Sequence, residues 1–145
     1  MTEPFIPICD GFWVSPQITA EDLEGAKSMG VSLVINNRPD GEEFGQCSGR
    51  EIEAAAAALG LSYVAIPVGL AGISGSDLDA FDRALGENDG GGVLAYCRSG
   101  TRSTILRALA QARAGRSVAE IIEEAANAGY AIAGQRRMLE AVAPD

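Results

Sequence analysis

Short apolar segments alternate with helical patterns along most of this chain, and that alternation restricts the folds it can adopt. Strands are predicted at 31–35, 63–67 and 93–96. Helical patterns fill the remaining intervals, at 19–30, 48–60, 77–86, 103–114, from 117 onward and at 134–142. Strands separated by helices in this way form βα units with a mainly parallel sheet. We therefore expect a single α/β domain over residues 1–145, with a central sheet flanked by helices.

Turn and capping signals support this arrangement. Residues 5–14 are typical of a hairpin around Asp10-Gly11. Ser48-x-x-Glu51 and Ser76-x-x-Asp79 are capping patterns, which predict where two helices begin. In a parallel sheet, ligands bind beyond the carboxyl ends of the strands. The segment that follows the strand at 93–96 is expected to lie at this edge.

The segment after that strand is the strongest functional signal in the chain. Cys97 ends the apolar run, and Arg102 follows after four intervening residues, where a helical pattern begins. The unpaired N–H groups at a helix N-terminus favour an anion, so a cysteine placed there is favoured as the reactive thiolate. Ser99, Gly100 and Thr101 let successive N–H groups converge on one point. A lone cysteine after a strand is usually a small buried hydrophobe, but this surrounding sequence predicts a catalytic nucleophile.

Composition excludes several other functions. The chain carries a net charge of −9 and no histidine, which argues against nucleic-acid binding and excludes histidine-based metal sites and triads. Its three cysteines are widely spaced, so neither a disulfide framework nor a metal-ligand pattern is expected. No apolar run approaches membrane-spanning length, and the N-terminus lacks a signal-type pattern. We expect a cytoplasmic protein that uses no metal or cofactor and binds no membrane.

The charge distribution points to the same segment. Residues 1–96 contain 4 basic and 15 acidic side chains, whereas residues 97–145 contain 7 and 5. The arginines after residue 97 can attract a small anion to an otherwise acidic protein. Of these, only Arg98 and Arg102 are assigned to the site.

Two families resemble different parts of the chain. Residues 15–23 and the stretch from Gly30 through Asn37-Arg-Pro-Asp-Gly-Glu42 resemble dual-specificity protein phosphatases, whereas residues 96–103 (Tyr-Cys-Arg-Ser-Gly-Thr-Arg-Ser) resemble the active loop of rhodanese sulfurtransferases. The phosphatase-like domain of beta-lactamase-hydrolase-like proteins combines both, and members of that family are also described as sulfurtransferases. The resemblance runs from about Trp13 to Tyr130 and implies a cysteine-phosphatase-like fold.

Loop size and a missing acid favour sulfur transfer over phosphate hydrolysis. Cysteine phosphatases use Cys-x5-Arg, usually with a preceding histidine, but here the spacing is Cys-x4-Arg and Tyr96 takes the histidine position. A smaller ring suits one terminal sulfur better than three phosphoryl oxygens. The resemblance also implies a general-acid aspartate after Ile66-Pro67, yet residues 68–75 contain no carboxylate. We therefore predict a sulfurtransferase that forms a persulfide on Cys97, with a cysteine-dependent phosphatase as the alternative and a persulfide or redox sensor as a second.

Site roles follow from this prediction. Cys97 and Arg102 are the predicted catalytic residues, although Arg102 could instead brace the loop. Substrate contacts are predicted for the rest of the loop, namely Arg98, Ser99, Gly100, Thr101 and Ser103. Arg38, Asp40 and Glu42 close the loop after a neighbouring strand and are expected to approach the same face, or else to form a turn braced by Arg38.

The expected partners are small molecules. The predicted substrate is a small anionic sulfur donor, such as thiosulfate or a persulfide, or a phosphate ester under the alternative. The family resemblance suggests a persulfide dioxygenase as a working partner. Cys47 is interpreted either as a resolving thiol or, more simply, as a spectator.

Overall fold

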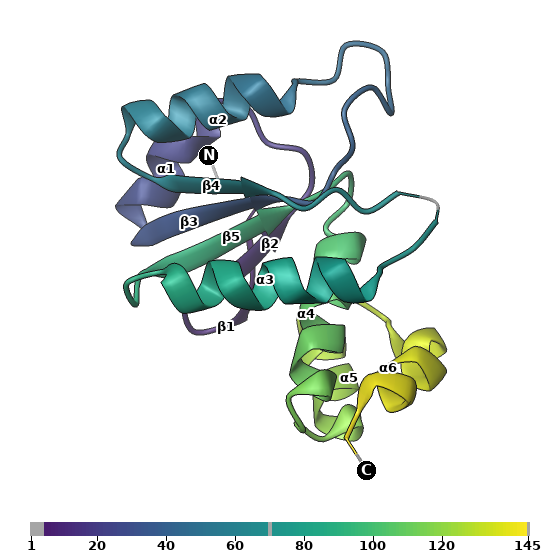
Figure 1. The fold of residues 1–145 in the computed structure, drawn as a ribbon. Helices are drawn as coiled ribbons and strands as arrows, with labels where there is room; N and C mark the ends of the chain where they lie inside the picture. Colours follow the sequence, from purple (N-terminus) through teal and green to yellow (C-terminus); the bar gives the residue numbers. More distant parts are fainter. Residues whose placement is uncertain (1–4, 70, 145) are drawn as a thin grey trace.

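The computed structural model describes residues 5–69 and 71–144 and contains a five-stranded sheet in the order β1-β2-β5-β3-β4 (Figure 1). The strands are β1 (Ile6–Cys9), β2 (Phe12–Ser15), β3 (Val31–Asn36), β4 (Ser62–Ala65) and β5 (Gly92–Tyr96). β1 pairs antiparallel with β2, and the other three pairings are parallel. The predicted hairpin and mainly parallel α/β sheet are confirmed.

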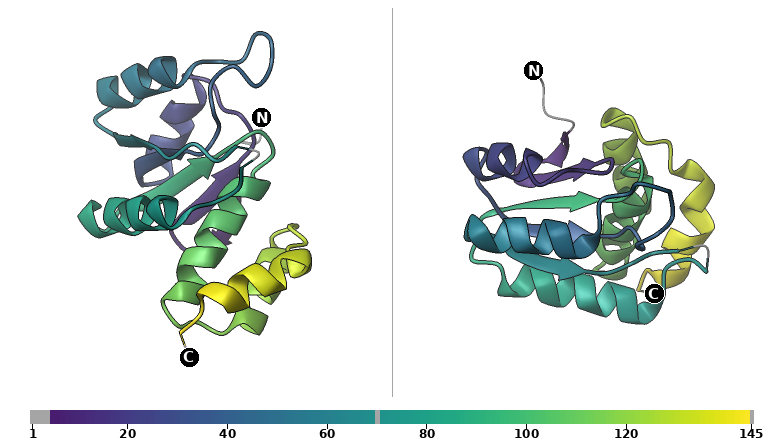
Figure 2. Two further views of the ribbon diagram at one scale, coloured as in Figure 1. Left: turned by 45° about the vertical axis from the view of Figure 1, so that its right-hand side comes forward. Right: turned by 90° about the horizontal axis from the view of Figure 1, so that it is seen from above.

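Helices cover both faces of the sheet, as the views in Figures 1 and 2 show. One face is covered by α1 (Asp22–Ser28) and α2 (Gly49–Ala58). The other carries α3 (Gly75–Glu87), α4 (Thr101–Arg113), α5 (Val118–Asn127), the short 3₁₀ helix η1 (Ala133–Gln135) and α6 (Arg136–Val142). Within the described residues, no helix is both long and apolar enough to cross a bilayer.

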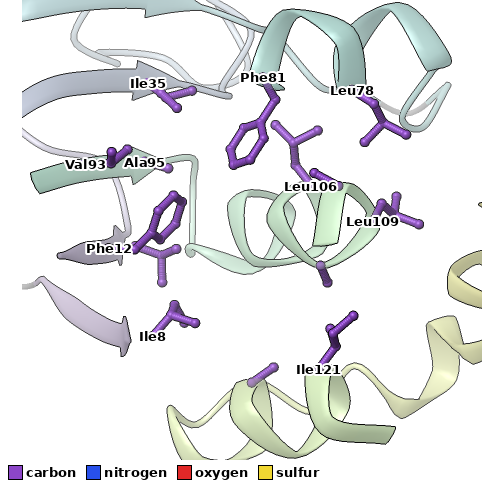
Figure 3. Close-up of a cluster of buried hydrophobic side chains, with 14 of the residues drawn as sticks. Ile8, Phe12, Ile35, Leu78, Phe81, Val93, Ala95, Leu106, Leu109 and Ile121 are labelled. Atoms are coloured by element: carbon purple, nitrogen blue, oxygen red, sulfur yellow. The ribbon is translucent and has the colours of Figure 1, made fainter. Parts of the chain in front are cut away.

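Alternating side chains of the buried strands supply both cores. In β3, Leu33 and Ile35 pack with the core beneath α3 and α4, whereas Val34 packs with the core beneath α1 and α2. This is the two-residue repeat of a strand buried on both faces. The larger core is drawn in Figure 3, where the rings of Phe12 and Phe81 lie 6.1 Å apart between the sheet and α3. These contacts fix the position of α4, which begins at the predicted site.

Local capping signals explain where two helices begin. The Ser48–Glu51 capping box is present at the start of α2, as predicted. The prediction that Ser76 and Asp79 cap the next helix is wrong, because the capping box at the start of α3 is formed by Ser74 and Asp77 instead. Two overlapping Ser-x-x-Asp patterns occur in this segment. The earlier one caps α3, and Asp79 of the later one pairs with Arg113 of α4 instead.

The four parallel strands end at the same edge of the sheet. Ser15, Asn36, Ala65 and Tyr96 are the last residues of β2, β3, β4 and β5. The segments that follow them therefore meet at one end of the molecule, on the right in Figure 1. β5 lies between β2 and β3, so the residue that follows it is surrounded by loops on both sides.

Candidate active site

Cys97 lies at the end of the central strand β5 and beneath the N-terminus of α4. Its amide donates to the Ser15 carbonyl at 3.2 Å, which extends the pairing with β2 by one residue. The residue is completely buried. The Gly100 amide donates to the Cys97 sulfur at 3.0 Å, which stabilises negative charge on that sulfur. The Cys97 sulfur is therefore enclosed by the protein and hydrogen-bonded to the turn that leads into α4.

Gly100 makes the tight turn between Cys97 and α4 possible. Its φ of +93° is a left-handed conformation that residues other than glycine rarely adopt. A Cβ atom at this position would also overlap the hydroxyl of Tyr130. The Gly100 carbonyl accepts from the Thr104 hydroxyl at 2.8 Å, which anchors the turn to the first turn of α4.

The other loop residues face outward. The Ser99 hydroxyl donates to that of Thr101 at 3.1 Å, and both residues are exposed. The Arg98 side chain is 64% exposed and lies 3.4 Å from the Glu43 carboxylate. The predicted substrate contacts at Arg98, Ser99 and Thr101 thus stand at the entrance of the loop, where an anion would approach.

Arg102 is held by a carboxylate from the loop after β3. Its two terminal nitrogens donate to the two Glu42 oxygens at 2.7 and 2.8 Å, and Nη1 also donates to the Val68 carbonyl at 2.7 Å. The hydrogen bonds from Arg102 lower the pKa of Glu42 to about 2. The pairing with Glu42 raises the pKa of Arg102, and the nearby charge of Cys97 contributes in the same direction.

The geometry leaves part of the Arg102 fork free. A guanidinium carries five N–H donors, and the contacts with Glu42 and Val68 use the edge formed by Nη1 and Nη2. The opposite edge, formed by Nε and the second N–H of Nη2, matches two oxygens of a phosphoryl group. Glu42 thus orients Arg102 and leaves it able to bind an anion.

Arg38 and Asp40 belong to the scaffold around the site. Arg38 is 2% exposed and donates to Glu42 at 2.9 Å and to Gln17 at 3.0 Å. It therefore braces the loop, as the simpler interpretation of this segment expected. Asp40 accepts from the Gly49 amide at 2.8 Å and so caps α2, away from the sulfur. Of the three residues predicted to approach Cys97, only Glu42 contacts a predicted catalytic side chain.

Two residues that support the loop were missed by the sequence analysis. The buried Asn37 accepts from the Ser103 hydroxyl at 2.8 Å and donates to the Ile66 carbonyl at 2.9 Å, which joins the segment after β3 to the first turn of α4 and to the segment after β4. The Ser103 hydroxyl is thereby engaged inside the protein and does not face the loop entrance. Tyr130, after α5, donates its hydroxyl to the Ser99 carbonyl at 3.0 Å. The segment after α5 therefore supports the active loop directly.

The other two cysteines are engaged elsewhere. The Cys47 sulfur lies 3.5 Å from a Glu51 oxygen, and burial together with this carboxylate raises the pKa of the thiol. A thiol with a raised pKa is a poorer source of thiolate, which favours the spectator interpretation. Cys9 accepts from Arg107 at 3.2 Å. In the described part of the chain, no cluster of three or more His, Cys, Asp or Glu side chains is placed to hold a metal ion.

A buried cysteine, the N-terminus of α4 and an arginine held by a carboxylate thus lie together at one end of the sheet. The profile of the family described as beta-lactamase hydrolase-like protein, phosphatase-like domain, matches residues 5–114. The chain belongs to this family. The beta-lactamase hydrolase-like protein of Agrobacterium fabrum is 34% identical over 128 residues, which is 88% of this chain and 30% of that protein. The chain thus spans less than a third of that relative's length.

Solved structures share the fold across the whole domain. A candidate phosphatase from Neisseria meningitidis is 31% identical, with a TM-score of 0.84 over 98% of this chain and 99% of that one. The core catalytic domain of a PP-IP phosphatase from S. cerevisiae is 16% identical, with a TM-score of 0.69 over 95% of this chain and 84% of that one. At that identity the yeast structure shows the fold alone. The cysteine-phosphatase-like α/β fold predicted from the sequence is confirmed.

These comparisons overturn the predicted sulfurtransferase activity. The matched family is described as phosphatase-like, and the Neisseria structure, at 31% identity, is described as that of a candidate phosphatase. The loop-size argument failed because it treated Cys97 and Arg102 as two ends of a closed ring. In the structure, α4 begins at Thr101 and carries Arg102 on its first turn. The helix and Glu42 therefore set the reach of this guanidinium, and the loop length alone does not.

Proposed function

We propose that this chain is a cysteine-dependent phosphatase that hydrolyses phosphate monoesters through a phosphocysteine at Cys97. The observation that carries this proposal is the Cys97 sulfur, which accepts the Gly100 amide at 3.0 Å beneath the N-terminus of α4. A helix terminus of this kind binds a phosphoryl group through its free N–H groups and its dipole. Membership of a phosphatase-like family supports the same chemistry.

The proposed reaction has two displacements. First, the Cys97 thiolate attacks phosphorus, the bond to the ester oxygen breaks, and that oxygen leaves with the electron pair. Water then attacks the phosphocysteine, the sulfur–phosphorus bond breaks, and both protons of the water remain on the released dihydrogen phosphate. Arg102 binds two equatorial oxygens through its free edge, and the backbone amides of the loop bind the charge that develops on them.

The remaining loop residues have supporting roles in this proposal. Arg98 at the entrance draws the dianionic ester toward the loop. Ser99, Gly100 and Thr101 contribute backbone amides. The hydrogen bond between the Ser103 hydroxyl and the Asn37 side chain stabilises the loop from inside the protein. We also propose a cytoplasmic location, because three unpaired and widely spaced cysteines suit a reducing compartment.

Initial rates with p-nitrophenyl phosphate test this function. Cys97→Ser is expected to abolish phosphate release. Arg102→Lys is expected to lower kcat/KM by about 10- to 100-fold, because lysine keeps the charge but lacks the two parallel N–H donors of a guanidinium. Cys47→Ser is the matched control and should keep wild-type rates. Phosphate release that survives Cys97→Ser would refute the proposal.

A further inference from the structure

The sequence of the segment after β4, whose Val68 carbonyl contacts Arg102, contains no ionisable side chain. Arg102 donates to the Val68 carbonyl at 2.7 Å, which places the segment after β4 directly beside the active loop. Residues 67–74 read Pro-Val-Gly-Leu-Ala-Gly-Ile-Ser, with no ionisable side chain. The hydroxyl of Ser74 accepts from the Asp77 amide and caps α3. No carboxyl or other ionisable group of this segment is therefore available to protonate a departing oxygen.

The carboxylates nearest to this segment in sequence have other partners. Asp77 accepts from the Ser74 amide at 2.9 Å as part of the α3 capping box. Asp79 pairs with Arg113 at 3.0 Å. Both residues therefore serve α3 and its packing against α4.

The carboxylates on the opposite side of the site are also engaged. Glu42 pairs with Arg102 and Arg38, and its pKa of about 2 keeps it ionised at neutral pH, so it has no proton to give. Glu43 pairs with Arg38 and Arg98 at 3.3 and 3.4 Å. Asp40 accepts from the α2 backbone.

Two tyrosines remain near the loop. The hydroxyl of Tyr96 has no partner among the described residues, but this residue packs in the core beneath α1 and α2. Tyr130 contacts the loop but is badly placed to act. Its hydroxyl already donates to the Ser99 carbonyl at 3.0 Å. Burial and the charge of Cys97 raise the pKa of this phenol, which makes it a weaker proton donor. Among the residues that the structure describes, none presents a free proton to an ester oxygen above Cys97.

This lack has a chemical consequence that depends on the leaving group. An alkoxide is the conjugate base of an alcohol that is about as weakly acidic as water. It leaves slowly unless an acid protonates it, and a positioned acid contributes about 10²- to 10⁴-fold in rate. A phenolate, whose conjugate acid has a pKa of about 10, leaves far more readily as the anion.

Resting on the proposed phosphatase function, we infer that the site acts on phosphate monoesters whose leaving group departs as a stable anion, such as aryl phosphates. Esters of alkyl alcohols, including those of serine, threonine and sugars, are poor substrates. In the first displacement, the electron pair of the P–O bond stays on the phenolate oxygen, which takes a proton from water only after it has left the site. Selectivity thus arises from the chemistry of the leaving group and needs no pocket that recognises it.

Phenyl phosphate and benzyl phosphate form a matched pair for testing this inference. Both present the same ring, but one releases a phenolate and the other an alkoxide. The expected kcat/KM for phenyl phosphate exceeds that for benzyl phosphate by at least about 100-fold, because no acid protonates the benzyl alkoxide as it leaves. A ratio below that value, with turnover still lost in Cys97→Ser, would overturn the inference and leave the phosphatase function standing.

Two further readouts complete the experiment. Asp77→Asn and Asp79→Asn are expected to leave the ratio unchanged. If either variant slows benzyl phosphate without slowing phenyl phosphate, that carboxylate donates the proton and the inference is wrong. If no Cys97-dependent phosphate release occurs with p-nitrophenyl, phenyl or benzyl phosphate, the phosphatase function itself fails, and the inference fails with it.

Discussion

Replacing Glu42 by glutamine tests whether this carboxylate orients Arg102 or merely blocks it. The substitution keeps the shape of the side chain but removes the charge that pairs with both Arg102 nitrogens. The Glu42 pKa falls from 4.5 to about 2 in the folded protein, and a shift of this size corresponds to about 3 kcal/mol. About a quarter of each side chain of the pair is exposed, so water screens the charges. We therefore assign a smaller free energy of about 1–2 kcal/mol to the pairing of Glu42 with Arg102.

This free energy sets the expected effect on catalysis. If the pairing is what holds the free edge of Arg102 over Cys97, its loss should lower kcat/KM for p-nitrophenyl phosphate by about 5- to 30-fold. Glu43→Gln is the matched control, because Glu43 is half exposed and its contacts with Arg38 and Arg98 are longer. That control should change kcat/KM by less than about 2-fold.

The opposite result would refute this reasoning. Cys97 is completely buried, and if Glu42 blocked the site, neutralising this carboxylate would give a faster enzyme. A Glu42→Gln variant with kcat/KM at or above the wild-type value would show that Glu42 competes with the substrate for Arg102.

Three other perturbations follow from contacts around the loop. Asn37→Ala leaves the partners of a buried amide unsatisfied, so urea denaturation should show a loss of about 2 kcal/mol or more, whereas an unchanged midpoint would contradict the bridging role. Gly100→Ala forces a side chain into φ +93° and against Tyr130, so thermal melting should show a destabilisation of at least about 2 kcal/mol, and a wild-type melting temperature would refute the strain argument. Because the Glu42 pKa is lowered from 4.5 to about 2, its pairing stabilises the fold above pH 4.5 and is lost as the pH falls toward 2. Urea midpoints across that range should therefore fall more steeply for the wild type than for Glu42→Gln, and parallel curves would contradict the pairing.

The elements that could be predicted from the sequence are those fixed by local patterns. β3 and β5 are apolar segments between helical repeats, and the Ser48 capping box marks the start of α2 within a few residues. The position of Cys97 at the end of a parallel strand followed from this order alone. Where two capping patterns overlapped, at Ser74 and Ser76, local information could not decide between them, because the pairing that engages Asp79 comes from the distant Arg113.

The contacts that define the site are nonlocal, and the sequence could not supply them. Arg102 and Glu42 are 60 residues apart, Ser103 and Asn37 are 66 apart, and Tyr130 reaches the active loop from beyond α5. The spacing between Cys97 and Arg102 was visible in the sequence, but its meaning depended on the helix and carboxylate that position the arginine. This is why loop length favoured the wrong reaction.

The most direct test of the proposed chemistry is to look for the phosphoryl group on Cys97 during turnover. Radiolabelled p-nitrophenyl phosphate is mixed rapidly with the enzyme, the reaction is quenched within milliseconds, and the labelled peptide is mapped. The proposed mechanism predicts label on the peptide that contains Cys97, formed at least as fast as phosphate is released and absent from Cys97→Ser. Phosphate release without a labelled cysteine, or label that persists in Cys97→Ser, would contradict it.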